Sequence, residues 1–153
     1  MLLKNDVALI TGAGNGIGRA TAVRFAKEGA KVVLADVDET GLAETKQLVE
    51  AAGGQAAVVT GSVAARDDVQ KMVDTAVSTY GQLSILINNA GITRDGLTAR
   101  IKDGQPQLMS DEKWDAVLNV NLKGTWLCSQ LAAVPMIAAG ERRVVHTAPH
   151  RSP

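Results

Sequence analysis

Short apolar runs alternate with helical segments along most of the chain, and this alternation constrains the fold more than any other feature. The runs are four or five residues long and lie at residues 7–10, 31–35, 56–59 and 83–87. Runs of this kind are typical of parallel strands that are buried on both faces of a sheet. The alternation therefore predicts an α/β fold, a doubly wound parallel sheet with helices on both faces.

The clearest helical signal is an apolar stripe with spacings of three and four residues, formed by Val69, Met72, Val73, Ala76, Val77 and Tyr80. Gly29, Gly53 and Gly81 are placed to end three of the predicted helices. Residues 92–109 are predicted to form a loop, because the Asp-Gly pairs at 95–96 and 103–104 are turn signals.

Another helix is expected after this loop. Ser110 is placed to cap it, and the helix is predicted to reach Met136 or beyond, with Pro135 bending or ending it. Residues 144–145 are a candidate fifth strand. Because the carboxyl ends of parallel strands carry the ligand sites of such sheets, polar clusters that follow the strands are expected to converge at one edge.

Composition limits the function classes. A chain of 153 residues predicts one domain. Sixteen Lys and Arg balance sixteen Asp and Glu, which argues against a nucleic-acid binder and against a polybasic membrane anchor. The single cysteine, Cys128, excludes an intrachain disulfide and a cysteine-based zinc cluster. No signal peptide or membrane span is evident, so we expect a soluble, cytoplasmic protein without a metal site.

A glycine-rich segment follows the first predicted strand and precedes a helix. Residues 11–18 have the pattern T-G-x-x-x-G-x-G, which matches neither the usual G-x-G-x-x-G pattern nor a Walker motif. Glycines in this position let the backbone approach a pyrophosphate at the positive end of the helix. A glycine-rich turn needed only for packing is the alternative, and the strand–turn–helix context favours dinucleotide binding.

Asp36 ends the second predicted strand, where a carboxylate reaches the adenosine ribose hydroxyls of a dinucleotide. A carboxylate repels the 2′-phosphate of NADP, and Asn15 supplies no compensating positive charge. Both residues therefore predict NAD as the cofactor. The alternative is that Asp36 only caps the following helix, although Asp38 is available for that role.

Amide side chains mark two further positions. Asn88-Asn89-Ala90-Gly91 follows the fourth predicted strand, where short amides either lock neighbouring strand ends or form a plain turn. Asn121 lies on a predicted apolar stripe with Trp114, Leu118 and Leu122, and a buried amide there needs partners. An Asn bonded to backbone and an Asn facing the cofactor cleft both remain open.

Together, residues 11–18, Asp36, residues 88–91 and residues 119–124 resemble the short-chain dehydrogenase/reductase family. Residues 88–97 are especially similar to its 3-oxoacyl-[acyl-carrier-protein] reductase branch, with hydroxyacyl and sugar-alcohol dehydrogenases as close competitors. The resemblance spans about residues 4–140. It implies a truncated Rossmann-like NAD(P)-binding domain over residues 1–140, hydride transfer between NAD(P) and an alcohol or ketone, and homo-oligomers among full-length relatives.

The resemblance also implies roles by position. Asn121 would be the asparagine of an Asn-Ser-Tyr-Lys catalytic set. The implied cofactor-binding residues are Gly12, Asn15, Gly16, Ile17, Gly18, Asp36, Ser62, Val63, Asn89, Ala90 and Gly91. The family usually has Asp where Ser62 stands. Residues 102–108 resemble an insertion, for which adaptation to substrate and a neutral surface loop are both open.

Three catalytic residues of the family have no match. Pro149 stands where the Ser is expected, Ser152 is a poor substitute, and no Tyr-x-x-x-Lys pattern occurs. Tyr80, the single tyrosine, belongs to another helix. We therefore expect this chain to be inactive, whether its substrate is a small molecule or an acyl-carrier conjugate.

Residues 141–153 form an atypical tail containing three Arg and two His, and the two histidines, His146 and His150, are interpreted as incidental rather than as a metal site. We hypothesise a shifted reading frame after about Gly140, because the family pattern is lost abruptly inside the expected fifth strand. Three hypotheses follow: a disrupted oxidoreductase, a non-catalytic NAD-binding fragment, and a chain that cannot fold alone.

Overall fold

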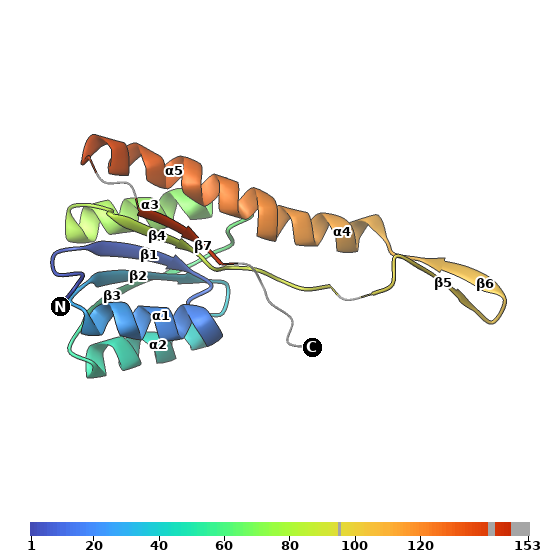
Figure 1. Ribbon diagram of the computed structural model, residues 1–153, viewed down its shortest axis with the longest axis horizontal. Coiled ribbons are helices and arrows are strands. Elements are labelled where there is room, and N and C mark those ends of the chain that lie inside the picture. Colours follow the sequence, from blue (N-terminus) through green and yellow to red (C-terminus); the bar gives the residue numbers. More distant parts are fainter. Residues whose placement is uncertain (95, 141–142, 148–153) are drawn as a thin grey trace.

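The computed structural model describes residues 1–94, 96–140 and 143–147. Its main sheet has five parallel strands in the order β3-β2-β1-β4-β7 (Figure 1). These strands are β1 (Val7–Thr11), β2 (Lys31–Asp36), β3 (Gln55–Thr60), β4 (Ile85–Asn88) and β7 (Arg143–His146). The helices are α1 (Gly16–Lys27), α2 (Glu39–Ala51), α3 (Arg66–Tyr80), α4 (Asp111–Leu118) and α5 (Thr125–Ala138). The predicted doubly wound α/β sheet is confirmed, including a strand at residues 144–145.

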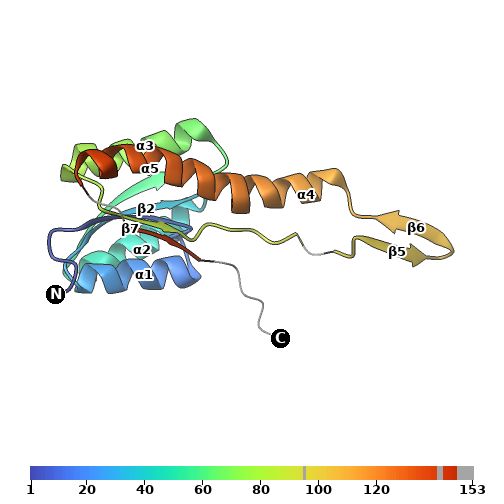
Figure 2. The same cartoon turned by 45° about the horizontal axis from the view of Figure 1, so that its top comes forward.

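Helices cover both faces of this sheet. α1 and α2 lie on one face, and α3 and α5 lie on the other (Figure 2). Successive strand residues point to opposite faces, so neighbours in β1 enter different cores. Leu9 packs in the core beneath α3 and α5, whereas Ile10 packs in the core beneath α1 and α2. Burial on both sides is why the strand sequences read as continuous apolar runs.

The central strands are anchored where they begin. The backbone N–H of Val7 donates to the buried Ser84 hydroxyl at 2.9 Å, and that hydroxyl also bonds the Asp6 carboxylate at 3.0 Å. The Asp6 carboxylate also forms an ion pair with Arg143 at the start of β7, in which the Arg143 Nη1 lies 2.9 Å from the Asp6 Oδ2. These contacts tie β1, β4 and β7 together at their amino ends and leave the carboxyl ends free for a site.

The predicted loop over residues 92–109 is wrong in part, because it contains a β-hairpin. Strands β5 (Ala99–Lys102) and β6 (Gln105–Leu108) pair antiparallel and project from the body of the molecule (Figure 1). The Asp103-Gly104 turn signal lies at its tip, where both residues have positive φ. A turn signal was therefore located correctly, but the strands on either side of it were not predicted.

The hairpin has one apolar and one polar face, because residues directly opposite each other share a face. Ala99 opposes Leu108 and Ile101 opposes Pro106, which makes the apolar face. On the polar face Arg100 opposes Gln107, and its Nε donates to the Gln107 amide oxygen at 2.8 Å. All residues of both strands are exposed, so the hairpin contributes little to the core.

Replacing residues 99–108 by Asn-Gly is expected to leave the fold intact. Because only exposed side chains are removed, the melting temperature should change by about 2 °C or less. Circular dichroism during heating measures this change, with Leu86→Ala in the core as a variant that must melt much earlier. A loss of about 5 °C or more on hairpin replacement would show that the hairpin supports the body.

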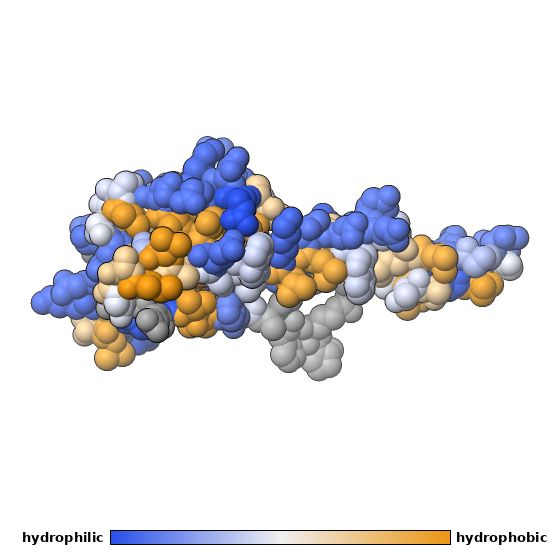
Figure 3. Space-filling view, turned by 90° about the horizontal axis from the view of Figure 1, so that it is seen from above, coloured by the Kyte–Doolittle hydropathy of each residue, from blue (hydrophilic) through white to orange (hydrophobic). Residues whose placement is uncertain are grey.

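α4 continues into α5 through a π-helical turn, η1 (Asn119–Gly124). Pro135 lies inside α5, which continues to Ala138, so this proline does not end the helix. The predicted apolar stripe on this helix is not buried: Trp114 is 61% exposed and Leu122 is 65% exposed. Val77, which belongs to the predicted apolar stripe of α3, is also exposed. Apolar surface consequently extends over the outside of this helical layer (Figure 3).

The core side of α5 is well packed. Leu127, Cys128, Ala132 and Met136 are buried against the sheet. Burial raises the pKa of the Cys128 thiol to about 12, so this cysteine remains protonated and unreactive near neutral pH. Within the part of the chain that the structure describes, no helix is long and apolar enough to cross a membrane.

Candidate functional site

A cavity of about 220 Å³ opens at the carboxyl ends of the central strands. The loops after β1, β2, β3 and β4 form it, as expected at this edge of a doubly wound sheet. The structure brings most of the predicted cofactor-binding residues to its walls, namely Gly12, Asn15, Asp36, Ser62, Val63, Asn89, Ala90 and Gly91. Gly16, Ile17 and Gly18 lie in the adjoining first turn of α1 rather than on the cavity wall.

The glycine-rich loop is packed too closely for side chains at two positions. A Cβ on Gly12, which has a φ of +65°, would lie 2.9 Å from the Ala90 Cα. A Cβ on Gly18 would lie 2.1 Å from the Gly12 carbonyl oxygen. Gly16 differs, because a Cβ there would meet no atom within 4 Å. Gly18 therefore packs α1 against the loop, while Gly16 faces open space.

The amino end of α1 presents backbone N–H groups that can donate hydrogen bonds to a ligand. Asn15 is the N-cap residue, but its side chain makes no capping hydrogen bond, and the first turn carries no acidic residue. The first N–H groups of a helix have no intrahelical acceptor, and the helix dipole is positive at this end. This end of α1 can therefore bind an anion at the rim of the cavity.

Asp36 is held with its carboxylate at the cavity wall. Its Oδ2 accepts from the Gly14 backbone N–H at 2.9 Å, and its Oδ1 accepts from the Asp38 N–H at 3.1 Å. Asp38 caps α2 by accepting from the Gly41 N–H at 3.0 Å. The two aspartates thus have separate roles, and the alternative that Asp36 only caps α2 is wrong.

Thr11 and Asn89 join the ends of β1 and β4. The Thr11 hydroxyl accepts from the N–H groups of Asn89 and Ala90, both at 3.0 Å. The Asn89 Nδ2 donates to the carbonyls of Thr11 at 3.2 Å and Gly12 at 3.1 Å, and its Oδ1 accepts from the Thr147 hydroxyl at 3.1 Å. The predicted locking of strand ends by short amides is confirmed for this residue.

Asn88 makes a similar connection on the other side of β4. Its Nδ2 donates to the Ser129 hydroxyl and approaches the His146 Nδ1, both at 3.1 Å. These contacts fasten β4 to α5 and β7. His146 therefore has a structural contact, whereas His150, named with it in the sequence analysis, lies outside the described residues, as do Pro149 and Ser152.

Ser62 and Val63 form the wall after β3. The Ser62 N–H donates to the Asp68 Oδ2 at 2.9 Å, and its hydroxyl accepts from the Ala64 N–H at 3.2 Å. Val63 is buried, and a Cβ on Gly124 would lie 2.6 Å from its Cγ2. Asp68 thus holds the loop that carries Ser62, a role that the sequence analysis did not assign.

Asn121 uses its whole side-chain amide to hold the loop after β4. Its Oδ1 accepts from the Ile92 N–H at 2.8 Å, and its Nδ2 donates to the Ile92 carbonyl at 2.9 Å. Of the two interpretations of this residue, the structure shows the amide bonded to backbone. Ile92 lines the cavity, so Asn121 acts on the cavity wall through Ile92.

Arg19 and Thr45 brace the glycine-rich loop and were missed by sequence reasoning. Arg19 donates to the Gly14 carbonyl and, at 3.0 Å, to the Thr45 hydroxyl, and it forms an ion pair with Glu44 at 2.8 Å. The buried Thr45 hydroxyl donates to the Ala13 carbonyl at 2.8 Å. The sequence signal that could have indicated this role is a threonine, Thr45, at a core position of a predicted helix.

Tyr80 lies away from this cavity, at the end of α3. It packs against the core, the Lys31 ammonium lies 5.5 Å from its ring centre, and burial raises its pKa above the ordinary value. A phenol with a raised pKa that does not line the cavity is poorly suited to proton transfer there.

Comparison with known proteins identifies the class to which this fold and site belong. The family model described as short chain dehydrogenase matches residues 6–151, so the chain belongs to the short-chain dehydrogenase family. It is 39% identical over 146 residues to 3-oxoacyl-[acyl-carrier-protein] reductase FabG of Thermotoga maritima, covering 95% of this chain and 56% of that protein. A 3-oxoacyl-[acyl-carrier-protein] reductase of Synechocystis sp. is 36% identical over 145 residues, covering 94% of this chain and 56% of that protein. The chain thus spans about half the length of the curated relatives it matches.

Solved structures show the same fold. NAD⁺-bound xylitol dehydrogenase matches with a TM-score of 0.85 and 30% identity, over 97% of this chain and 54% of that one. A metagenomic short-chain oxidoreductase in complex with NADP matches with a TM-score of 0.84 and 31% identity, over 95% of this chain and 63% of that one. Structural neighbours of this chain therefore include both NAD-bound and NADP-bound proteins.

Proposed function

We propose that this chain binds NAD in the cavity at the carboxyl ends of its strands, as part of an oxidoreductase that acts on alcohols or ketones. The observation that carries the proposal is the Asp36 carboxylate, held at the cavity wall by the Gly14 and Asp38 N–H groups. Beside it lie the uncapped amino end of α1 and a glycine loop that has no room for side chains at Gly12 and Gly18. This combination of groups suits a ribose beside a pyrophosphate.

Each wall has a proposed partner on the cofactor. The residues Gly12, Asn15, Gly16, Ile17 and Gly18 would face the pyrophosphate side, and Asp36 would accept from the adenosine ribose hydroxyls. Ser62 and Val63 would flank the adenine, and Asn89, Ala90 and Gly91 would line the nicotinamide side. When bound, NAD⁺ would accept a hydride from an alcohol and NADH would supply one to a ketone, and the chain's own residues would bind and orient the cofactor.

The preference for NAD over NADP rests on charge. A 2′-phosphate would stand beside the Asp36 carboxylate, and the neighbouring side chains on that wall, Val37 and Asn15, carry no positive charge. Repulsion between the Asp36 carboxylate and the 2′-phosphate would weaken the binding of NADP.

The oxidoreductase activity itself is proposed from the family. Two relatives, 39% and 36% identical to this chain, are 3-oxoacyl-[acyl-carrier-protein] reductases, so a 3-oxoacyl thioester is one proposed substrate. We also propose that the whole enzyme is a homo-oligomer. For this chain alone we propose cofactor binding without turnover. Its single tyrosine does not line the cavity and so cannot act there as a general acid or base. Loss of general acid–base catalysis typically lowers the rate by about 10²–10⁴-fold.

Calorimetric titration with NAD tests the proposal. We expect saturable binding at one site, no oxidation of simple alcohols, and a melting temperature raised by about 5–10 °C at a hundredfold excess over Kd. NADP serves as the matched ligand and should bind more weakly. A cooperatively melting chain that binds neither cofactor would overturn the proposal, and a chain that aggregates without a cooperative transition would favour the hypothesis that it cannot fold alone.

A further inference from the structure

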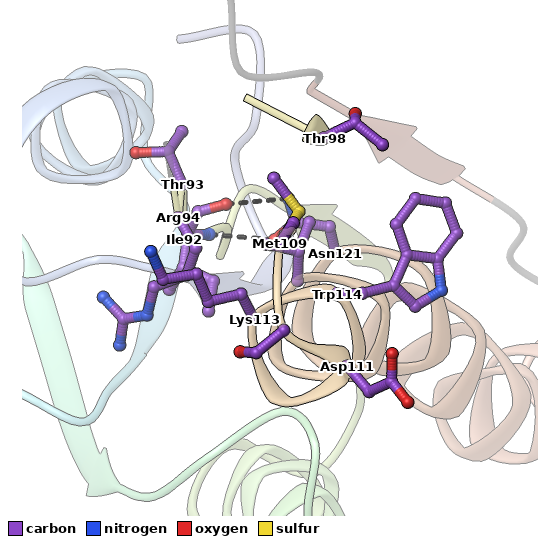
Figure 4. A pocket seen from close by; sticks show the side chains of 11 residues that line it. Ile92, Thr93, Arg94, Thr98, Met109, Asp111, Lys113, Trp114 and Asn121 are labelled. Atoms are coloured by element: carbon purple, nitrogen blue, oxygen red, sulfur yellow. Dashed lines mark hydrogen bonds between the residues drawn. The ribbon is translucent and has the colours of Figure 1, made fainter. Parts of the chain in front are cut away.

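A second cavity, of about 480 Å³, lies between the loop after β4 and the start of α4 (Figure 4). Its lining includes Ile92, which also lines the proposed NAD cavity. Asn121 lines it too, and its amide bonds the Ile92 backbone in both directions (Figure 4). The two cavities therefore share a wall, and a molecule in the second would lie next to the nicotinamide side of the first.

The lining of this second cavity is apolar on one side and cationic on another. Met109, Trp114 and Val117 supply the apolar surface, and Trp114 is 61% exposed. The side chains of Arg94 and Lys113 extend on the side opposite the indole (Figure 4). A ligand that fills the cavity would contact a flat aromatic face with one part and two cations with another.

These two cations have no counter-ion among the residues that the structure describes. Asp111, the acidic residue of the lining, extends on the Trp114 side, away from them (Figure 4). Two cations without a counter-ion among the described residues attract an oxyanion to this side of an apolar cavity, and the carboxylate of Asp111 disfavours an anion at the other end.

The cationic side continues toward the hairpin. A neighbouring groove of about 560 Å³ shares Met109, Ser110 and Lys113 with the cavity and adds Arg100 from β5. Arg100 thus extends the cationic side outward, and Gln107 and Leu108, which belong to the segment that resembles an insertion, line the same groove.

From this arrangement we infer that the second cavity is a binding site for an apolar molecule that carries an oxyanion, a carboxylate or a phosphate. Its apolar part would stack on Trp114 and its oxyanion would bind Arg94 and Lys113. That this molecule is the substrate of the oxidoreductase rests on the proposed function, whereas its binding does not.

Fluorescence of Trp114 tests the inference directly. The chain has two tryptophans, so Trp126→Phe leaves Trp114 as the single indole. Three probes of one shape are titrated: 4-phenylbutanoate, 4-phenylbutan-1-ol and 4-phenylbutylamine. We expect saturable quenching by the carboxylate, with a Kd about tenfold lower than that of the alcohol, and the weakest binding for the amine. 2-Phenylethyl phosphate, compared with 2-phenylethanol, separates a preference for phosphate from one for carboxylate.

Charge-neutral variants locate the oxyanion. Arg94→Gln and Lys113→Gln should each raise the Kd of the carboxylate by about tenfold and leave that of the alcohol unchanged. Lys102→Gln, an exposed hairpin lysine that lines neither groove, makes the same charge change and should alter neither Kd. Equal affinity for the three phenylbutyl probes, or equal effects of all three variants, would overturn the inference.

An NAD titration of the same samples separates this inference from the proposed function. If the carboxylate binds and NAD does not, the second cavity is supported and the proposed function fails. If NAD binds and the carboxylate causes no saturable change at Trp114, the inference fails and the proposed function stands.

Discussion

Gly18→Ala is expected to lower the free energy of unfolding by about 3 kcal/mol or more and to abolish measurable NAD binding. The added Cβ would lie 2.1 Å from the Gly12 carbonyl oxygen and 2.7 Å from the Asn89 Nδ2. Both neighbours are held in place, because Asn89 is hydrogen bonded to the backbone of Thr11 and Gly12. The clash must therefore push α1 away from the loop, which displaces the amino end proposed to bind the pyrophosphate.

Urea unfolding and calorimetric NAD titration measure the two effects of this change. Gly53→Ala is the matched control, because Gly53 has a φ of +81° and a Cβ there would meet no atom within 4 Å. That control should cost only about 1 kcal/mol of backbone strain and leave the Kd for NAD unchanged. Similar losses in both variants would show that the close approach at Gly18 is not what the fold requires.

Asp36→Ala is expected to raise the Kd for NAD by about 10- to 100-fold while changing the Kd for NADP far less. A hydrogen bond to a charged group contributes about 1.5–3 kcal/mol, and each 1.4 kcal/mol corresponds to a factor of ten. Loss of the carboxylate removes the proposed ribose contact for NAD, but it also removes repulsion of the 2′-phosphate. The ratio of the two dissociation constants, measured on one preparation, is the informative quantity.

Asp38→Ala is the control for this experiment, because Asp38 lies only two residues after Asp36 but caps α2. Loss of a cap costs about 1 kcal/mol of stability, and the NAD to NADP ratio should remain that of the unmodified chain. If Asp36→Ala weakens both cofactors equally, Asp36 holds the Gly14 loop without contacting a ribose, and the argument for NAD preference is lost.

The strands and the glycine-rich turn could be predicted from sequence because their signals are local. A strand buried on both faces requires an uninterrupted apolar run, as at residues 7–10, and a run of that kind has few other uses in a chain of this composition. Right-handed connections between parallel strands limit the possible strand orders, and the structure supplies the observed one, β3-β2-β1-β4-β7. Gly12, Asp36 and Asn89 each lie at the carboxyl end of a predicted parallel strand. Because these ends meet at one edge of the sheet, the sequence was enough to predict that the three residues lie around one cavity.

The errors arose where burial or pairing depends on a neighbour. The spacing of Trp114, Leu118 and Leu122 is that of a buried helical face, yet in the structure this face is largely exposed. Periodicity shows that a face is apolar, but it does not show which element covers it. The hairpin was missed for a related reason, because β5 and β6 alternate apolar and polar residues over only four positions each.

By itself, the sequence determined the class of fold, the position of each main strand, and the family to which the chain is similar, because all three depend on residue types at fixed spacings. Only the tertiary structure decided how the polar groups divide their roles. Asp36 accepts from Gly14 while Asp38 caps α2, and Asn121 bonds Ile92, because folding brings these groups within hydrogen-bond distance. Hydrogen bonds between residues distant in sequence depend on positions set by the packing of whole elements, which no local pattern records.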